Sequence, residues 1–302
     1  MKTVKTIMVA ALAVLASCGQ REKEYDATGT FEATEVTVSA EQSGTLLRFA
    51  LEEGDNIAAG QEVGLIDTTQ IWLKLQQADA TKAVYQSQKP DLEKQIAATR
   101  QQLEKAKTEQ RRYQELVSDG AAPGKMLDDA TNQVKVLQRQ LDAQISSLGT
   151  STNALNQQMA ATDVQKSQLA DQLKKCHVVA PQAGTVLEKY VEQGEFAAPG
   201  KPLFKMADTQ QMFMRAYITS AQLQNVKVGQ KAKVFADYGD GQRKEYDGTV
   251  TWISSRSEFT PKTILTDDER ADLVYAVKVA VKNDGYIKIG MYGEVKFETT
   301  TD

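Results

Sequence analysis

The sequence predicts an elongated protein of mixed α and β structure, in which a β-sandwich is split by a long antiparallel α-helical coiled-coil hairpin and followed by a small β-barrel. Three observations predict this fold class. A glycine-bearing segment, residues 40–67, recurs 140 positions later; the residues between the two copies are rich in helix formers; and the last third alternates apolar and polar residues as strands do.

Composition excludes several classes of function. The 302 residues carry 36 Lys and Arg against 40 Asp and Glu, a net charge of -4 that argues against a nucleic-acid binder. A single histidine, His177, and two cysteines, Cys18 and Cys176, leave little for a His/Cys metal site or a nucleophile–histidine pair. We therefore expect no metal, no cofactor and no catalytic residue, although an enzyme based on carboxylates alone stays open.

Residues 1–18 have the pattern of an export signal. Lys2 and Lys5 precede an apolar run from Ile7 to Leu15, which is far shorter than the roughly 20 residues that span a bilayer as a helix. The run ends in Leu15-Ala16-Ser17-Cys18, which is similar to a bacterial lipobox and predicts that Cys18 becomes the acylated N-terminus. The alternative is an ordinary secretory signal with an incidental cysteine.

After this signal, residues 19–38 are expected to form a linker and one strand that leads into the sandwich, with residues 25–38 as the strand. Residues 39–68 and 176–208 are the two half-motifs. Within them, residues 40–67 align without gaps with residues 180–207 and are identical at nine positions, among them three pairs of glycines: Gly44/Gly184, Gly54/Gly194 and Gly60/Gly200. Glycines that recur in register predict two backbones with the same turns, and two such halves can close on one core.

This repeat resembles the two halves of a biotinyl/lipoyl domain, in which a lysine at the turn between the halves carries the cofactor. Here about a hundred residues replace that turn, so no lysine occupies the carrier position. Lys205, in Phe204-Lys205-Met206, superficially resembles a carrier lysine, but it lies at the far end of the second half and not at the turn between the halves. The resemblance therefore implies the sandwich fold without an attached cofactor.

Residues 69–175 are predicted to form the helical hairpin, with its tip at 118–124. In the second arm, leucine or valine recurs every seven residues, at Leu127, Val134, Leu141, Leu148 and Leu155. Two arms of about fifty residues reach ~70–75 Å. Pro90 in the first arm and the poor helix formers around Gly149 in the second predict a joint at the same height in both arms. A compact helical bundle is the alternative.

Residues 209–302 are predicted to form the barrel. Strands are expected at 212–218, 231–237, 247–253, 273–281 and 291–298, with one short helix at 219–225. Turn residues separate the strands, and closure of the barrel would remove exposed strand edges.

The order of lipid anchor, half-sandwich, helical hairpin, half-sandwich and barrel is similar to that of the periplasmic adaptor subunits, or membrane fusion proteins of the HlyD family, of tripartite exporters. The resemblance implies a ring, usually of six copies, that bridges an inner-membrane pump and an outer-membrane channel of the TolC type. Residues 258–279 look like the barrel segment of adaptors that serve ATP-driven (ABC) exporters.

The same resemblance supplies candidate site residues. Hairpin tips of the family often carry an arginine, a leucine four residues later and a serine seven after that; Arg112 and Leu116 match, and Pro123 stands at the serine position. The candidate channel-docking residues are Arg112, Leu116, Gly120 and Pro123. The candidate pump-facing loop of the barrel comprises Glu258, Asp267, Asp268 and Arg270, although most charged loops are only solvated.

The resulting expectation is a non-enzymatic adaptor in the periplasm of a Gram-negative bacterium, anchored through Cys18 in the inner membrane, that serves the export of drugs or other small compounds. Two alternatives remain. The partner could be a proton-driven pump instead of an ABC exporter, or the chain could be a monomeric coiled-coil scaffold with no role in transport.

Overall fold

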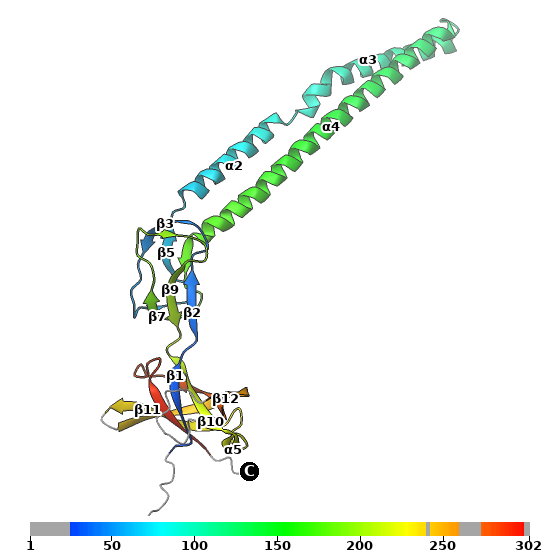
Figure 1. Ribbon diagram of the computed structural model, residues 1–302. Helices are drawn as coiled ribbons and strands as arrows, with labels where there is room; N and C mark the ends of the chain where they lie inside the picture. Colours follow the sequence, from blue (N-terminus) through cyan, green and yellow to red (C-terminus); the bar gives the residue numbers. More distant parts are fainter. Residues whose placement is uncertain (1–24, 240–241, 260–272, 299–302) are drawn as a thin grey trace, which may run out of the picture.

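The computed structural model describes residues 25–239, 242–259 and 273–298, which form three parts in a row: a barrel, a sandwich and a projecting helical hairpin (Figure 1). Cys18, Asp267, Asp268 and Arg270 lie outside the described residues. Within the described ranges, every helix is too short or too polar to cross a bilayer.

The sandwich contains two four-stranded sheets, in the orders β2-β9-β7-β4 and β6-β5-β3-β8. Each sheet therefore combines strands of both half-motifs, which places segments 140 positions apart on one core. The strands of the first half are β2 (Glu35–Ser39), β3 (Gly44–Phe49), β4 (Asn56–Ile57) and β5 (Glu62–Ile66). Those of the second are β6 (His177–Val179), β7 (Gly184–Lys189), β8 (Phe196–Ala197) and β9 (Pro202–Ala207).

The two halves are related by an approximate two-fold axis that the hydrogen bonds make visible. The Gly54 amide donates to the Val186 carbonyl at 2.9 Å, and the equivalent Gly194 amide donates to the Leu46 carbonyl at 2.8 Å. Gly60 and Gly200 likewise donate to Ala180 and Ala40, at 2.7 and 2.8 Å. The repeat therefore folds as one closed unit, as predicted.

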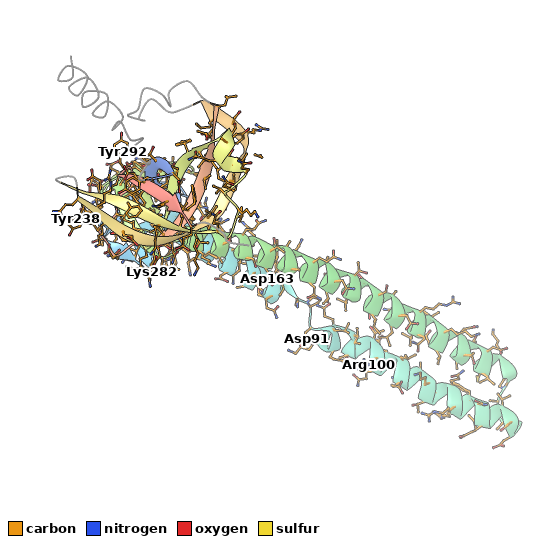
Figure 2. All side chains as sticks on the ribbon, turned by 90° about the horizontal axis from the view of Figure 1, so that it is seen from below. Asp91, Arg100, Asp163, Tyr238, Lys282 and Tyr292 are labelled. Atoms are coloured by element: carbon orange, nitrogen blue, oxygen red, sulfur yellow. The ribbon has the colours of Figure 1, made fainter. Side chains whose placement is uncertain are left out.

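The hairpin consists of α2 (Thr69–Gln88) and α3 (Leu92–Ser118) in the first arm and α4 (Gly124–Lys175) in the second. The first arm breaks before Pro90, because proline disfavours helical backbone in the residue before it and offers no amide hydrogen. The carboxylate of Asp91 then caps α3 by accepting from the Lys94 amide at 3.2 Å (Figure 2).

The joint predicted in the second arm is wrong, because α4 continues through Gly149. A glycine costs a helix about 1 kcal/mol but keeps its amide hydrogen, and the Thr150 hydroxyl donates to the Ser146 carbonyl at 3.0 Å without breaking the helix. Near the base, α2 and α4 are joined by ion pairs of Lys82 with Asp163 and of Lys166 with Asp79. Further along, Ile96, Leu103, Leu137 and Leu141 form the apolar contact between α3 and α4.

The barrel is closed by six strands in the order β1-β10-β13-β12-β11-β14. They are β1 (Ala27–Glu32), β10 (Gln211–Thr219), β11 (Lys231–Gly239), β12 (Gln242–Phe259), β13 (Leu273–Lys282) and β14 (Tyr292–Phe297), with a short helix, α5 (Ser220–Leu223). Its core is filled by small and β-branched side chains around Phe31, Met212 and Met214.

One strand prediction needs correction. Residues 25–38 do not form a single strand that leads into the sandwich, and residues 209–302 do not form the barrel alone. The segment is two strands: β1 pairs with β10 and β14 and completes the barrel, whereas β2 pairs with β9 in the sandwich. The reason is non-local, because the five later strands of the barrel leave a gap that only a strand from elsewhere can fill.

Candidate docking site at the hairpin tip

The cysteine and the histidine of the described residues do not form a catalytic pair. Cys176 is 0% exposed in the sandwich core, where burial raises the pKa of its thiol and the thiol donates to the Gln172 carbonyl at 3.4 Å. His177 lies on the outer face, with Nδ1 2.9 Å from the Glu62 carboxylate. Among the described residues, no group of three or more His, Cys, Asp and Glu side chains could hold a metal ion.

The tip of the hairpin is a tight turn fixed by backbone hydrogen bonds. The Ala121 amide donates to the Leu116 carbonyl at 2.8 Å, and the Gly120 amide donates to the Val117 carbonyl at 3.1 Å. This is the Schellman pattern at a helix end, and it requires the left-handed backbone that Gly120 adopts with φ 69°. Pro123 precedes the first turn of α4, where its missing amide hydrogen costs nothing.

The predicted tip residues lie together at this end of the hairpin. Arg112 is 70% exposed, and its nearest carboxylate, that of Glu109, lies 3.8 Å away. Leu116 is one turn further along α3 and half-buried, while Gly120 and Pro123 are exposed in the turn. The four residues therefore place an exposed cation beside a turn that is held by backbone hydrogen bonds.

Sequence reasoning missed a groove directly below these residues. It has a volume of about 740 Å³ between α3 and α4 and is lined by Gln102, Lys105, Ala106, Glu109, Tyr113, Met126, Asp129, Ala130, Gln133 and Leu137. Ala106 and Ala130 occupy positions where larger side chains would fill the space between the helices. The sequence feature that could have predicted the groove is alanine, a small residue, at these two core positions of the heptad pattern.

Apolar and charged side chains occupy different parts of this groove. Tyr113 and the 46% exposed Met126 lie at its tip end, and Leu137 lies toward the base. Lys105, Glu109 and Asp129 supply charges along the sides. An apolar floor with charged sides is what a helix-in-groove contact needs: methionine adapts to the incoming side chain, and the charges select its register.

The half-motif glycines divide into two kinds. Gly54, Gly60, Gly194 and Gly200 have positive φ values between 75° and 93°, which only glycine adopts without strain. At Gly44 and Gly184 the constraint is space. A Cβ would lie 2.8 Å from Cγ2 of Ile66 at Gly44 and 2.5 Å from the carbonyl oxygen of Ala207 at Gly184. These glycines position the sandwich backbone.

Of the candidate barrel loop, only Glu258 is described. Both of its carboxylate oxygens accept from one Arg215 nitrogen, at 2.9 and 3.0 Å, and the Arg215 Nε donates to the Tyr217 hydroxyl at 3.2 Å. The charge of Glu258 is therefore paired on the barrel wall, across from β10.

A split sandwich that carries a long helical hairpin and is joined to a closed barrel is the architecture of the envelope adaptor proteins. Residues 34–209 match the family described as RND MFP, barrel-sandwich hybrid domain. Because the match covers more than half of the chain, the protein belongs to this family of membrane fusion proteins, the adaptors of efflux systems. The predicted family and fold class are thereby confirmed.

The chain is also similar to curated relatives along most of its length. It is 28% identical to a UPF0194 membrane protein of Yersinia pseudotuberculosis, with 97% of each chain covered. A UPF0194 membrane protein of Acidithiobacillus ferridurans is 26% identical, with 89% of this chain and 86% of the relative covered.

Two solved structures share the fold. MacA from Actinobacillus actinomycetemcomitans has a TM-score of 0.57 at 19% identity, with 93% of this chain and 80% of MacA covered. A MacA–MexA chimeric protein that contains the α-hairpin domain of Pseudomonas aeruginosa MexA has a TM-score of 0.54 at 20% identity, with 90% of this chain and 80% of the chimera covered.

Proposed function

We propose that this protein is a non-enzymatic, lipid-anchored periplasmic adaptor that assembles into a ring of six copies. The ring couples an inner-membrane exporter to an outer-membrane channel of the TolC type for the export of drugs or other small compounds. Acylated Cys18 holds the protein in the inner membrane of a Gram-negative cell. The hairpin then points away from that membrane, because β1, the first described strand, lies in the barrel and the hairpin extends from the opposite end of the sandwich (Figure 1). The 52 residues of α4 reach about 78 Å.

The observation that carries this proposal is the groove at the end of that hairpin. A groove with an apolar floor, next to an exposed Arg112 and a rigid turn, suits the helical end of a channel subunit. A scaffold without a transport role would not need such a groove at the point furthest from its anchor.

We propose an ABC exporter as the pump, on the resemblance of residues 258–279 to adaptors of that class. A second candidate is a proton-driven pump, which is favoured by the description of the matched family as RND membrane fusion proteins. Pump and adaptor would meet at the barrel, where Asp267, Asp268 and Arg270 supply charges in the sequence beside the paired Glu258.

The test is to fill the groove. Ala130→Leu places a larger side chain in it, and Ala143→Leu makes the same change on an exposed position of α4 outside it. Tagged full-length chains are isolated from cross-linked envelopes, and the partners are identified by mass spectrometry. We expect Ala130→Leu to lose the channel at least tenfold while it keeps the pump, and Ala143→Leu to keep both.

Two outcomes would contradict the proposal. Channel recovery that is equal in both variants would exclude the groove as the docking site. Wild-type protein that brings down neither a pump nor a channel would favour the scaffold. Recovery of an ATPase subunit or of a proton-driven pump decides between the two pump classes.

A further inference from the structure

The loop that follows α5 contains a tight turn that hydrogen bonds hold against the barrel. The Gln230 amide donates to the Lys227 carbonyl at 3.1 Å, and Gly229 has the positive φ, 91°, that the third position of a type II turn requires. The Gln230 side chain also accepts from the Lys227 amide, at 2.8 Å. The Gly229 amide donates to the Val250 carbonyl at 2.8 Å, which ties the turn to β12. The position of Val228, the second residue of the turn, is therefore fixed by its neighbours.

Two valines of this loop lie in opposite surroundings. Val226 is 6% exposed and belongs to the barrel core, against which Leu223 of α5 also packs. Val228 is 64% exposed, the highest value among the large apolar side chains of the described residues. A single exposed valine is ordinary on a protein surface, so its meaning depends on where it lies and on what surrounds it.

The turn lies at the end of the barrel that is furthest from the sandwich. Figure 1 shows α5 at that end, and the Gln222 side chain of α5 donates to the Asp26 carbonyl, at 2.6 Å, just before β1. Tyr25 is seven residues after Cys18, and seven residues span at most about 25 Å when fully extended. With Cys18 acylated, this end of the barrel therefore lies within about that distance of the bilayer surface.

We propose that this turn, residues 227–230, contacts the lipid bilayer, with Val228 among the lipid headgroups and Lys227 and Lys231 against lipid phosphates. The inference rests on the lipid anchor of the proposed function. Both lysines are exposed, and in the part of the chain that the structure describes neither forms an ion pair with a carboxylate. An apolar side chain with cations on both sides suits an interfacial membrane contact, because the apolar group enters the boundary of the hydrocarbon while the cations bind anionic headgroups.

The size of the turn favours lipid over a protein as its partner. A stable protein interface buries about 800 Å² on each side, and a four-residue turn offers far less. A bilayer needs no matching surface, because its headgroups rearrange around a small apolar group. The pump is the other partner that could cover this end of the barrel, and the test below separates the two.

The barrel carries a matching turn at its opposite end. The Met291 amide donates to the Lys288 carbonyl at 3.1 Å, and Gly290 has a φ of 81°. The Gly290 amide donates to the Phe31 carbonyl at 2.8 Å, near the point where β1 leads to the sandwich. Ile289, which is 38% exposed, holds the position that Val228 holds in the first turn. The two turns share a lysine, a branched apolar residue and a glycine in the same order, so the second turn is a matched control for the first.

The test measures how close each turn lies to a bilayer. Val228→Cys and Ile289→Cys are each labelled with an environment-sensitive fluorophore. The Cys18 thiol is occupied by lipid and Cys176 is buried, so neither competes for the label. The full-length acylated chain is reconstituted without a pump in vesicles of phosphatidylethanolamine and phosphatidylglycerol that contain a quencher on the headgroup of one lipid. We expect quenching at position 228 to be at least threefold stronger than at position 289.

The charges are tested in the labelled Val228→Cys chain. Lys227→Glu places a negative charge beside anionic lipid and should reduce the quenching at least twofold. Lys288→Glu makes the same change in the matching turn and should leave the quenching at position 228 unchanged.

The alternatives give different results. Equal quenching at the two positions would overturn the inference. A fluorophore at position 228 that is shielded only after the pump is added would also overturn it, because the turn would then contact the pump. Flotation of the vesicles separates this failure from a failure of the proposed function. A chain that floats with the vesicles without stronger quenching at position 228 rejects only the lipid contact, whereas a chain that does not float rejects the lipid anchor as well.

Discussion

The side chain of Lys244 shows how single residues hold the barrel surface together. Its ammonium lies 5.9, 5.5 and 5.4 Å from the ring centroids of Tyr238, Tyr246 and Tyr286, and it forms an ion pair with Asp284. The Tyr246 hydroxyl also donates to Asp284, at 3.0 Å. Cation–π contacts and the ion pair thus tie β12 to the loop after β13.

This cluster predicts acid sensitivity of the barrel. The hydrogen bond from Lys244, helped by the Tyr286 amide, lowers the pKa of Asp284 from 3.8 to about 2. A carboxylate whose pKa is lower in the folded state adds stability above its unfolded pKa, and that stability is lost as the pH falls from about 4 to about 2. We expect Asp284→Asn to lack this part of the pH dependence, measured by denaturant unfolding at each pH.

The control is Asp128→Asn on the exposed surface of α4, which should follow the wild type. An Asp284→Asn protein that loses stability over this pH range as steeply as the wild type would show that Asp284 does not contribute.

At the level of elements, a glycine in a strand and a glycine in a helix differ in how much room the structure leaves for a side chain. The strands β7 and β9 approach so closely that Gly184 has no room for a methyl group beside the backbone of Ala207. Gly149, in the middle of α4, has open space around it. The strand glycine is thus required by packing, whereas the helix glycine is only a weak point in a long helix.

Alanine at these two positions should shift stability in opposite directions. We expect Gly184→Ala to lower the free energy of unfolding by roughly 1–3 kcal/mol, because the strands must move apart. Gly149→Ala should raise the stability of the hairpin by about 1 kcal/mol, since alanine is the better helix former. Urea unfolding followed by circular dichroism measures both. If Gly184→Ala left the free energy of unfolding unchanged, the sheet would accommodate the methyl group without loss of stability, which would contradict the prediction.

At the scale of the whole molecule, the polypeptide passes between the sandwich and the barrel twice, at residues 33–34 and 208–210. A series of hydrogen bonds also connects the two parts. The Thr185 hydroxyl donates to Asn56 at 2.8 Å and lies 2.9 Å from the Thr209 hydroxyl. The Thr209 carbonyl accepts from the Asn283 side chain, at 2.9 Å, on the barrel side. We therefore expect these hydrogen bonds to restrict the angle between the two parts, and through it the direction of the hairpin.

Removal of one hydroxyl should loosen that connection. Thr185→Val keeps the shape of the side chain and loses both of its hydrogen bonds, which are worth about 1 kcal/mol each. We expect a broader distance distribution between spin labels at positions 41 and 227, on the sandwich and the barrel, by pulsed electron resonance. Thr45→Val, the equivalent residue at the hairpin end of the sandwich, should leave the distribution unchanged, and equal broadening in both variants would reject the link.

Much of the fold could be predicted because its signals are local or repeated. The heptads between Leu127 and Leu155, the break before Pro90 and the glycines of the two halves each specify a backbone within a few residues of themselves. The tip residues Arg112 and Leu116 came from a family resemblance. The groove beside them could not be predicted, because its volume depends on how Ala106 of α3 and Ala130 of α4 lie relative to each other.

The sequence alone therefore determined the order of the parts, the closure of the repeat on itself and the outward projection of the hairpin. Only the tertiary structure decided that β1 belongs to the barrel, that α4 is unbroken at Gly149 and that Val226 is buried while Val228 is exposed. The physical reason is that periodicity and turn residues act within a segment, whereas strand exchange and the composition of a surface depend on contacts between segments far apart in the chain.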